Sequence, residues 1–354
     1  MKNGKFGFGI IGCGGIAGAH IRAIEANPEA ELVAVCDIIE DKGRKFGMDH
    51  GGVTNFYKNY LDLVKDPAVD IVCICTPSGL HGDGVIAAAK AGKAILCEKP
   101  LDISRDRMSE MIDAVDKAKV KMGCVFQLRT YANTIKVRKA IATGILGKMT
   151  LADAYLKDYR SRAYYASADW RGTWALDGGG CLMNQGVHGV DQLLWMTGAD
   201  VDRVFARADH LVRDIEVEDT CVANLQFTNG AFGTIVATTS CNPGETRRWE
   251  MHGDNGSICL TGQNITRWAT APIGSDEMAK NIEFTKEASE DGITHDPMAL
   301  SMEGHTFLVN DLIQALKEDR EPYVNGHSAR KAVDLILSIY ESARTGKDVK
   351  VPHY

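Results

Sequence analysis

The sequence of 354 residues predicts an α/β domain followed by an α+β domain. Up to about residue 126, short apolar runs alternate with helical patterns, which is typical of a doubly wound parallel sheet. From about residue 127 strand patterns dominate, and a chain of this length usually forms two domains. We therefore expect domains at 1–126 and 127–354. The second should be an open, mainly antiparallel sheet packed by helices.

The pattern of the first part of the chain predicts a buried strand, a glycine turn, a helix and a second strand, in that order. The strand is Phe6–Ile11, the turn matches G-x-G-x-x-[GA] over residues 12–17, and the second strand ends on Asp37. In such a unit one glycine permits the tight turn and another lets the backbone approach a pyrophosphate, which the helix N-terminus also favours. The pattern predicts a dinucleotide site of the Rossmann type.

Asp37 bears on the choice of cofactor. A carboxylate at this spacing accepts hydrogen bonds from the adenosine ribose and repels a 2′-phosphate, so NAD is expected and NADP is less favoured. Lys42 and Arg44 lie close by and weaken this preference. The expected contacts from this unit are Gly12, Gly14, Gly15, Ile16, Asp37 and Ile38.

The remaining elements follow from periodicity. In the first domain we expect strands at 54–56, 70–75, 94–97 and 122–126 and helices at about 40–49, 60–64, 81–91 and 104–119. In the second we expect strands at 150–159, 203–209, 219–227, 231–240, 248–252 and 257–260, with helices at 133–143, 181–196, 304–317 and 328–345. Asn229-Gly230 predicts a hairpin turn. A half-covered sheet of this size predicts a homodimer or homotetramer formed through it.

Composition narrows the class of protein. The formal net charge of −7 argues against nucleic acid as a main partner. No segment resembles a membrane span, and the first core strand at Phe6 leaves no room for a signal peptide, so we expect a cytoplasmic protein. The ten cysteines include no C-x-x-C pair, and no carboxylate–histidine cluster has metal-ligand spacing. We therefore expect no metal.

Glu98-Lys99-Pro100 follows the predicted strand at 94–97. Ligands of open α/β sheets bind beyond the carboxyl ends of the strands, and the proline restricts Lys99 to extended geometry. A cis bond before Pro100 is also compatible with the sequence. A surface lysine that happens to precede a proline explains the spacing equally well.

Gly178-Gly-Gly180 precedes a helical pattern with two neighbouring stripes. Met183, Val187, Val190 and Leu194 form the core stripe, and Asn184, His188, Asp191 and Trp195 form the other. A position near a helix N-terminus disfavours an imidazolium, so His188 would stay neutral and able to relay a proton. The alternative is a buried histidine bonded to Asp191.

Together these motifs resemble the Gfo/Idh/MocA oxidoreductases, the family of glucose–fructose oxidoreductase and inositol dehydrogenase. The resemblance also includes Thr76-Pro77 with His81, Ala91-Gly92-Lys93 and the C-terminal run at 339–346. It implies NAD(P)-dependent oxidation or reduction of a secondary alcohol on a sugar or cyclitol. It implies that Lys99 touches both nicotinamide ribose and substrate, and that His188 is catalytic. It also places Thr76, Pro77, Ser78, His81 and Glu98 at the cofactor.

The sequence departs from the family pattern at one position that affects proton transfer. Inositol dehydrogenase-like members carry Asp-x-x-x-His where this chain carries Asn184-Gln-Gly-Val-His188. Asparagine can orient a hydroxyl but cannot take its proton. We therefore assign the proton transfer to Lys99 and His188, and substrate contact to Asn184.

Other candidates are less specific. Trp170-Arg171 is a pair that the resemblance places near the cofactor, and Gln127 lies at the domain junction; both are expected at the cofactor. Arg129, His305 and Tyr159 are expected at the substrate, and Tyr159 opens an aromatic and basic run that suits hydroxyls or a phosphate. The same run would serve equally well as a subunit contact.

Three rival functions fit the same motifs. The first is an NAD-dependent redox glycosidase that acts through a 3-keto intermediate. The second is a non-catalytic cofactor sensor, which would not need both Lys99 and His188. The third is a sugar-nucleotide 3-dehydrogenase, which the basic run at 160–171 favours. The carbon oxidised and the physiological direction stay open.

Overall fold

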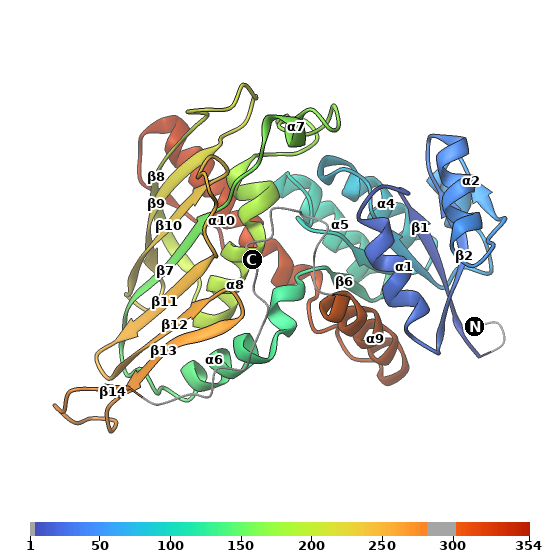
Figure 1. Cartoon of the computed structure of the whole chain (residues 1–354). Helices are drawn as coiled ribbons and strands as arrows, with labels where there is room; N and C mark the ends of the chain where they lie inside the picture. The colour runs from blue at the N-terminus through green and yellow to red at the C-terminus, as the bar shows by residue number, and fades with distance from the viewer. Residues whose placement is uncertain (1–3, 282–301) are drawn as a thin grey trace. The chain divides into compact units, whose positions relative to one another are not determined.

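A computed structural model describes residues 4–281 and 302–354, and these form two compact units (Figure 1). The first unit ends at Gln127, beside the expected boundary. After the gap, however, α9 (Met302–Glu318) and the chain up to Arg330 belong to the first unit. The prediction had assigned all of 127–354 to the second domain. The return was missed because α9 packs against α1 (Ala17–Glu25), nearly 300 residues away in sequence.

The first unit contains a six-stranded parallel sheet in the order β3-β2-β1-β4-β5-β6, which confirms the doubly wound fold. The chain reverses its direction of winding between β1 and β4, where ligands of such sheets bind. The strands are β1 (Phe6–Ile11), β2 (Ala30–Cys36), β3 (Phe56–Tyr57), β4 (Ile71–Ile74), β5 (Ala94–Cys97) and β6 (Met122–Cys124).

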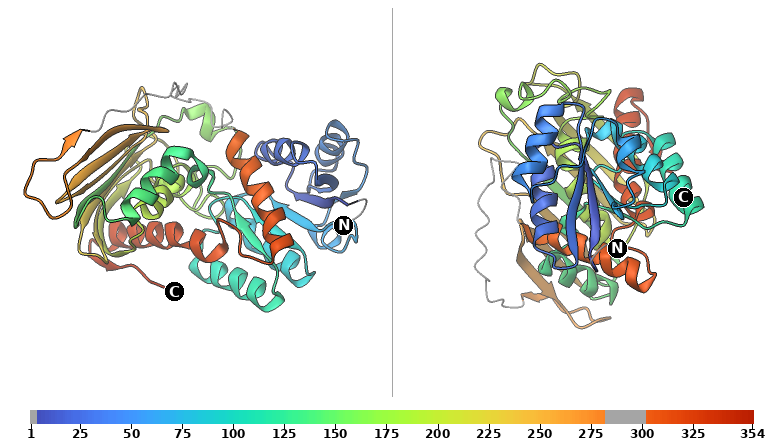
Figure 2. Two further views of the ribbon diagram at one scale, coloured as in Figure 1. Left: turned by 90° about the horizontal axis from the view of Figure 1, so that it is seen from below. Right: turned by 90° about the vertical axis from the view of Figure 1, so that its right-hand side faces the viewer.

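Helices cover both faces of this sheet. Figure 2 shows α1 and α2 on one face and α4 and α5 on the other. The remaining bounds are α2 (Glu40–Asp49), α3 (Tyr60–Leu63), α4 (His81–Lys90) and α5 (Arg105–Ala118), with the short 3₁₀ turns η1 (Ser78–Leu80) and η2 (Gln127–Thr130). Coverage on both faces explains why the strands read as continuous apolar runs.

The second unit contains a nine-stranded sheet among the described residues, in the order β14-β13-β12-β11-β7-β10-β9-β8-β15. All neighbouring strands are antiparallel except β7 and β10, which confirms the mainly antiparallel prediction. The strands are β7 (Met149–Lys157), β8 (Val201–Asp209), β9 (Thr220–Phe227), β10 (Phe232–Thr238), β11 (Arg248–Gly253), β12 (Gly256–Thr261), β13 (Asn264–Thr270), β14 (Lys280–Asn281) and β15 (Val349–Lys350).

Helices cover one face of this sheet, and no helix of the described residues lies on the other, which we call the bare face (Figure 1). Along β9 every second residue is buried, while Val222, Asn224 and Gln226 are exposed. The helices are α6 (Ala132–Ala142), α7 (Arg162–Tyr165), α8 (Val187–Thr197) and α10 (Gly326–Thr345). None of the helices in the described ranges has the length and apolar character that crossing a bilayer requires.

The helix expected over 181–196 is two elements. Residues Cys181–Gly186 form a π-helix, η3, and α8 begins only at Val187. A single α-helical register therefore does not hold across Asn184 and His188. Short π segments within helices occur frequently at functional sites.

Candidate active site

The glycine turn joins β1 to α1. Gly12 has φ +92°, and a Cβ on it would lie 2.7 Å from the carbonyl oxygen of Cys75, so the turn requires glycine there. At Gly14 a Cβ would meet no atom within 4 Å. The packing of the chain does not demand a glycine at position 14. The free space suits the close approach of a pyrophosphate.

Asp37 is held against this turn. Its Oδ2 accepts a hydrogen bond from the Cys13 N–H at 2.9 Å, and its Oδ1 accepts one from the Ile39 N–H at 2.9 Å. The Lys42 ammonium lies 3.3 Å from Oδ2. The next side chain, Ile38, is 81% exposed. A carboxylate and an open apolar side chain thus follow β2, where an adenosine would be recognised.

His81 connects the loops that follow β4 and β5. Its Nδ1 lies 2.8 Å from the Pro100 carbonyl oxygen and its Nε2 lies 3.0 Å from that of Thr76. Burial lowers the pKa of His81, although both carbonyls oppose this shift. Ser78 is also buried, and Thr76 and Pro77 are half-buried. His81 therefore joins the backbone after β4 to the Lys99-Pro100 segment.

Glu98 directly follows β5 and turns its carboxylate inward. Its Oε2 accepts a hydrogen bond from the backbone N–H of Lys99 at 3.1 Å. The Lys99-Pro100 peptide is cis, and the Lys99 side chain is half-buried. The acid next to the lysine thus restrains the lysine's own backbone.

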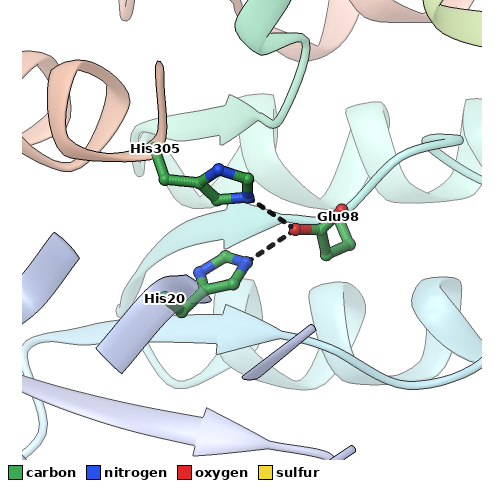
Figure 3. Close-up of side chains that lie close together, drawn as sticks. All are labelled: His20, Glu98 and His305. Atoms are coloured by element: carbon green, nitrogen blue, oxygen red, sulfur yellow. Dashed lines mark hydrogen bonds and ion pairs between the residues drawn. The ribbon is translucent and has the colours of Figure 1, made fainter. Parts of the chain in front are cut away.

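Two histidines complete the environment of Glu98. Figure 3 shows His20, from α1, and His305, from α9, directed at the same carboxylate oxygen. The distances from Glu98 Oε1 to their Nε2 atoms are 2.8 Å and 3.5 Å. Burial alone would raise the pKa of the Glu98 carboxyl, but the hydrogen bond with His20 and the nearby imidazole of His305 hold it well below its usual value. We call these three residues the carboxylate cluster.

The carboxylate cluster also groups three side chains that could ligate a metal, with ligand atoms within 4.8 Å of one another. Sequence spacing did not reveal this group. Ligands at about 2.0–2.1 Å from a tetrahedral zinc lie about 3.3 Å apart. The 2.8 Å separation of His20 and Glu98 is instead a hydrogen-bond length. This distance favours direct hydrogen bonding, and the expectation of no metal stays a prediction.

In the second unit, η3 is held at its N-terminus by a buried glutamate. Glu218 accepts hydrogen bonds from the backbone N–H groups of Gly180 (2.9 Å) and Leu182 (2.8 Å) and from the Tyr340 hydroxyl (2.8 Å). A Cβ at Gly180 would lie 2.0 Å from the Glu218 carbonyl oxygen, so the glycines allow this close approach. The arrangement sets the position of Asn184 within η3.

His188 lies in the first turn of α8 and is 9% exposed. Both oxygens of Asp191, one turn further along α8, accept hydrogen bonds from the buried Arg129 guanidinium, at 2.8 Å and 2.5 Å. Asn184 bonds through its amide to the buried Asp177.

Comparisons with known proteins agree with this fold. Residues 6–126 match the model of the oxidoreductase family with an NAD-binding Rossmann fold, and residues 134–259 match the GFO/IDH/MocA C-terminal domain. The WlbA dehydrogenase from Bordetella pertussis, solved in complex with NADH and UDP-GlcNAcA, is 31% identical, with a TM-score of 0.86 and coverage of 99% of this chain and 100% of that one. The chain belongs to the Gfo/Idh/MocA family of oxidoreductases.

Curated relatives in this family act on sugars and cyclitols. Myo-inositol 2-dehydrogenase of Thermotoga maritima is 28% identical over 348 residues, covering 97% of this chain and 98% of its own. Levoglucosan dehydrogenase of Pseudarthrobacter phenanthrenivorans is 28% identical over 281 residues, covering 71% and 72%. The protein is therefore an NAD-binding oxidoreductase, and its Gly14 and Asp37 geometry fits that cofactor.

The other expected site residues of this family member are distributed over both units. Gln127 is almost fully buried and lies against Gly304 of α9. Tyr159 and Trp170 are half-buried in the loop after β7. Arg129 is ion-paired to Asp191, so its contact with substrate stays a prediction.

Sequence reasoning missed three residues of these networks: His20, Asp177 and Gln185. His20 follows the small residue of the glycine turn by three positions, on the buried stripe of α1 with Ala17 and Ile24. A histidine on an otherwise apolar stripe was the available signal. Asp177 and Gln185 had no such signal, because they lie outside regular α-helix and strand.

Proposed function

We propose that this protein catalyses NAD-dependent hydride transfer involving a secondary alcohol of a sugar or cyclitol, and that Lys99 and His188 handle the hydroxyl proton. The observation that best supports the proposal is the hydrogen bond from the Lys99 backbone N–H to Glu98, which restrains the backbone of Lys99. The lysine follows β5 at the carboxyl edge of the sheet that also holds the glycine turn, and Glu98 binds its N–H. NAD supplies the hydride acceptor, and the protein supplies binding and proton transfer.

The division of roles follows from the side chains. Lysine and histidine can both accept and return a proton, whereas Asn184 can only donate and accept hydrogen bonds. Its amide donates to Asp177, and its carbonyl oxygen accepts from Gln185 at 2.8 Å. We assign Asn184 to orienting the reacting hydroxyl.

NAD is the preferred cofactor in this proposal because of Asp37. The carboxylate receives two backbone N–H groups and one lysine, and a 2′-phosphate would add negative charge directly beside it. The exposed Ile38 offers an apolar surface beside the carboxylate for an adenosine.

We also assign the bare face of the second sheet to a homo-oligomer interface. Large apolar side chains open to solvent, including Leu151, Val222 and Phe232, come from its strands. Light scattering at micromolar protein should give a multiple of the chain mass. A doubly charged variant, Val222→Asp with Phe232→Asp, should lower that mass.

The test of the function is a substrate panel. Polyols, hexoses, UDP-sugars and aryl glycosides are incubated with enzyme and NAD, and NADH absorbance and aglycone release are followed together. Net NADH from an alcohol substrate supports the proposal. Aglycone release without net NADH would establish the redox glycosidase instead, and a cofactor-bound protein inert toward every class would support the sensor.

A further inference from the structure

The loop between β7 and η3 carries two arginines on either side of one tyrosine. The guanidinium carbon of Arg171 lies 4.3 Å from the centre of the Tyr164 ring, and that of Arg160 lies 5.5 Å from it. Arg171 also stacks on Trp170 at 4.6 Å. Stacking on aromatic faces holds a guanidinium in place and leaves its in-plane N–H edge for a ligand.

Among the described residues, the hydrogen-bond partners of these arginines are neutral. Arg160 donates to the Gln185 side-chain oxygen at 3.0 Å and to the Tyr159 carbonyl oxygen at 2.8 Å. Arg171 donates to the Tyr164 hydroxyl. A third arginine, Arg213, stacks on the Tyr159 ring at 5.3 Å. We call Arg160, Arg171 and Arg213 the arginine cluster.

The arginine cluster contributes three positive charges to this loop region. Throughout residues 4–281 and 302–354, no carboxylate forms an ion pair with any of its members. The buried Nε atoms of Arg171 and Arg213 also lack a hydrogen-bond acceptor in those ranges. Arg160 and Arg213 are only 8% and 9% exposed, so water screens them poorly. Burial of a charge is costly unless it is paired.

Elsewhere in the same unit, one buried and one half-buried guanidinium group are paired with carboxylates. Arg129 is bound by Asp191 and Arg247 by Asp158. Two carboxylates near the arginine cluster are engaged with other groups: Asp177 receives the Gly172 N–H and the Asn184 amide, and Asp219 receives the backbone N–H groups of residues 211–213. Arg129 and Arg247 are thus paired with carboxylates, whereas Arg160, Arg171 and Arg213 have no such pair among the described residues.

We propose that the arginine cluster binds an oxyanion of the substrate, either the carboxylate of a sugar acid or the phosphate of a sugar phosphate or sugar nucleotide. This proposal rests on the function proposed above and narrows its substrate class. One side chain connects the cluster to the predicted reacting centre: Gln185 accepts from Arg160 and donates to the Tyr164 hydroxyl at 2.7 Å and to Asn184 at 2.8 Å. Guanidinium groups suit carboxylate and phosphate because two parallel N–H bonds form at once.

The test measures binding to full-length protein saturated with NADH. The probes are D-glucose, D-glucuronate, glucose 1-phosphate and UDP-glucose, titrated by calorimetry at low and high sodium chloride. At least one charged probe should bind about tenfold or more tightly than glucose at low salt, and should weaken as salt rises. The charged probe that binds best distinguishes the carboxylate from the phosphate source.

Variants then assign the effect. Arg160→Met and Arg171→Met should each weaken the charged probe about tenfold, and in Arg160→Met the affinities for glucose and NADH should stay unchanged. Arg171→Lys should recover part of the loss, because it keeps charge but not the planar fork. The matched control is Arg162→Met, which removes an exposed positive charge from α7 of the same loop.

The proposal is overturned if glucose binds as tightly as every charged probe to the native protein, a result that needs no variant to fold. It is also overturned if the arginine variants weaken charged and neutral probes alike, or change the oligomeric mass, since a second copy would then supply the counter-charge. Tight binding of a charged probe, with no alcohol in the panel giving NADH, would instead contradict the proposed function alone.

Discussion

The carboxylate cluster and the arginine cluster are both largely buried groups of ionisable side chains, but their charges are balanced in different ways. Glu98 has both oxygens occupied by its own chain, one by the Lys99 N–H and the other by His20 and His305. In the part of the chain that the structure describes, Arg160 and Arg171 have only neutral hydrogen-bond partners. The charge of the first cluster is satisfied by groups of its own chain, whereas the charge of the second has no counter-ion among the described residues.

This difference separates the two tasks of a binding site. A charge that is satisfied inside the chain positions backbone, as Glu98 does at Lys99. A charge that is left without a counter-ion is available to a ligand. We therefore expect changes in the carboxylate cluster to lower stability and turnover for every substrate, and changes in the arginine cluster to alter substrate preference.

The largest expected effect is on turnover and comes from changing Lys99, whose backbone N–H is bound by Glu98 of the carboxylate cluster. Lys99→Ala should lower turnover by about 10²-fold or more, because the variant lacks the general base that we propose. The affinity for NADH, measured by fluorescence titration, should stay largely unchanged. Near-normal turnover in this variant would defeat the assignment of Lys99.

The carboxylate cluster itself should matter for stability. Glu98→Gln keeps the shape but removes the charge that His20 and His305 contact, so the free energy of unfolding at pH 7 should fall by about 2 kcal/mol. Urea unfolding measures this. The matched control is Glu29→Gln, which alters an exposed pair between Glu29 and Lys317 of α9 and should change little.

The pH dependence of that difference gives an independent check. The pKa of Glu98 is held well below its usual value by the two histidines, so the charged form contributes stability that is fully present above the unfolded pKa of about 4.3. This contribution is lost as the pH falls through the lower, folded pKa. The difference in the free energy of unfolding between the native protein and Glu98→Gln should therefore become smaller below about pH 4.3. A gap that widens on acidification would show the opposite shift.

Cofactor choice should respond to Asp37. Asp37→Asn should raise the dissociation constant of NAD about tenfold, because a charged acceptor for the ribose hydroxyls becomes neutral. It should raise that of NADP less, since repulsion of the 2′-phosphate falls at the same time. Tighter binding of NADP than of NAD by the native protein would refute the preference.

The smallest expected effect concerns the thiol in the glycine turn. Burial and the Asp37 carboxylate raise the pKa of Cys13 to about 12, so almost no thiolate exists at pH 8. Mass spectrometry after iodoacetamide treatment should find Cys13 unmodified in the folded protein, while the partly exposed Cys241 reacts. Rapid labelling of Cys13 would mean that the turn opens in solution.

The parts of the fold that local patterns encode were predictable. The strand–turn–helix at residues 6–25 and the placement of Lys99 after β5 depend on residues close in sequence, and both are confirmed. Interactions between distant segments were not predictable. The bond from His20 to Glu98 spans 78 residues, and α9 returns to the first unit only after the whole second sheet.

The π-helix shows the same limit at shorter range. The periodicity of residues 181–196 indicated one α-helix, yet η3 occupies its first turns. Its N-terminus is held by Glu218, 38 residues beyond Gly180. No local sequence pattern therefore predicts the change from π-helix to α-helix. The core stripe of Met183, Val187, Val190 and Leu194 is nevertheless buried as expected.

We propose above that Lys99 and His188 act on the same hydroxyl group, and a double-mutant cycle on turnover tests this proposal most directly. Turnover is measured for Lys99→Ala, His188→Ala and the double variant with the best substrate of the panel. Residues that share one proton are strongly non-additive, so the double variant should be at most about threefold slower than the slower single variant. If the loss of turnover in the double variant equals the product of the two single losses, the account is contradicted.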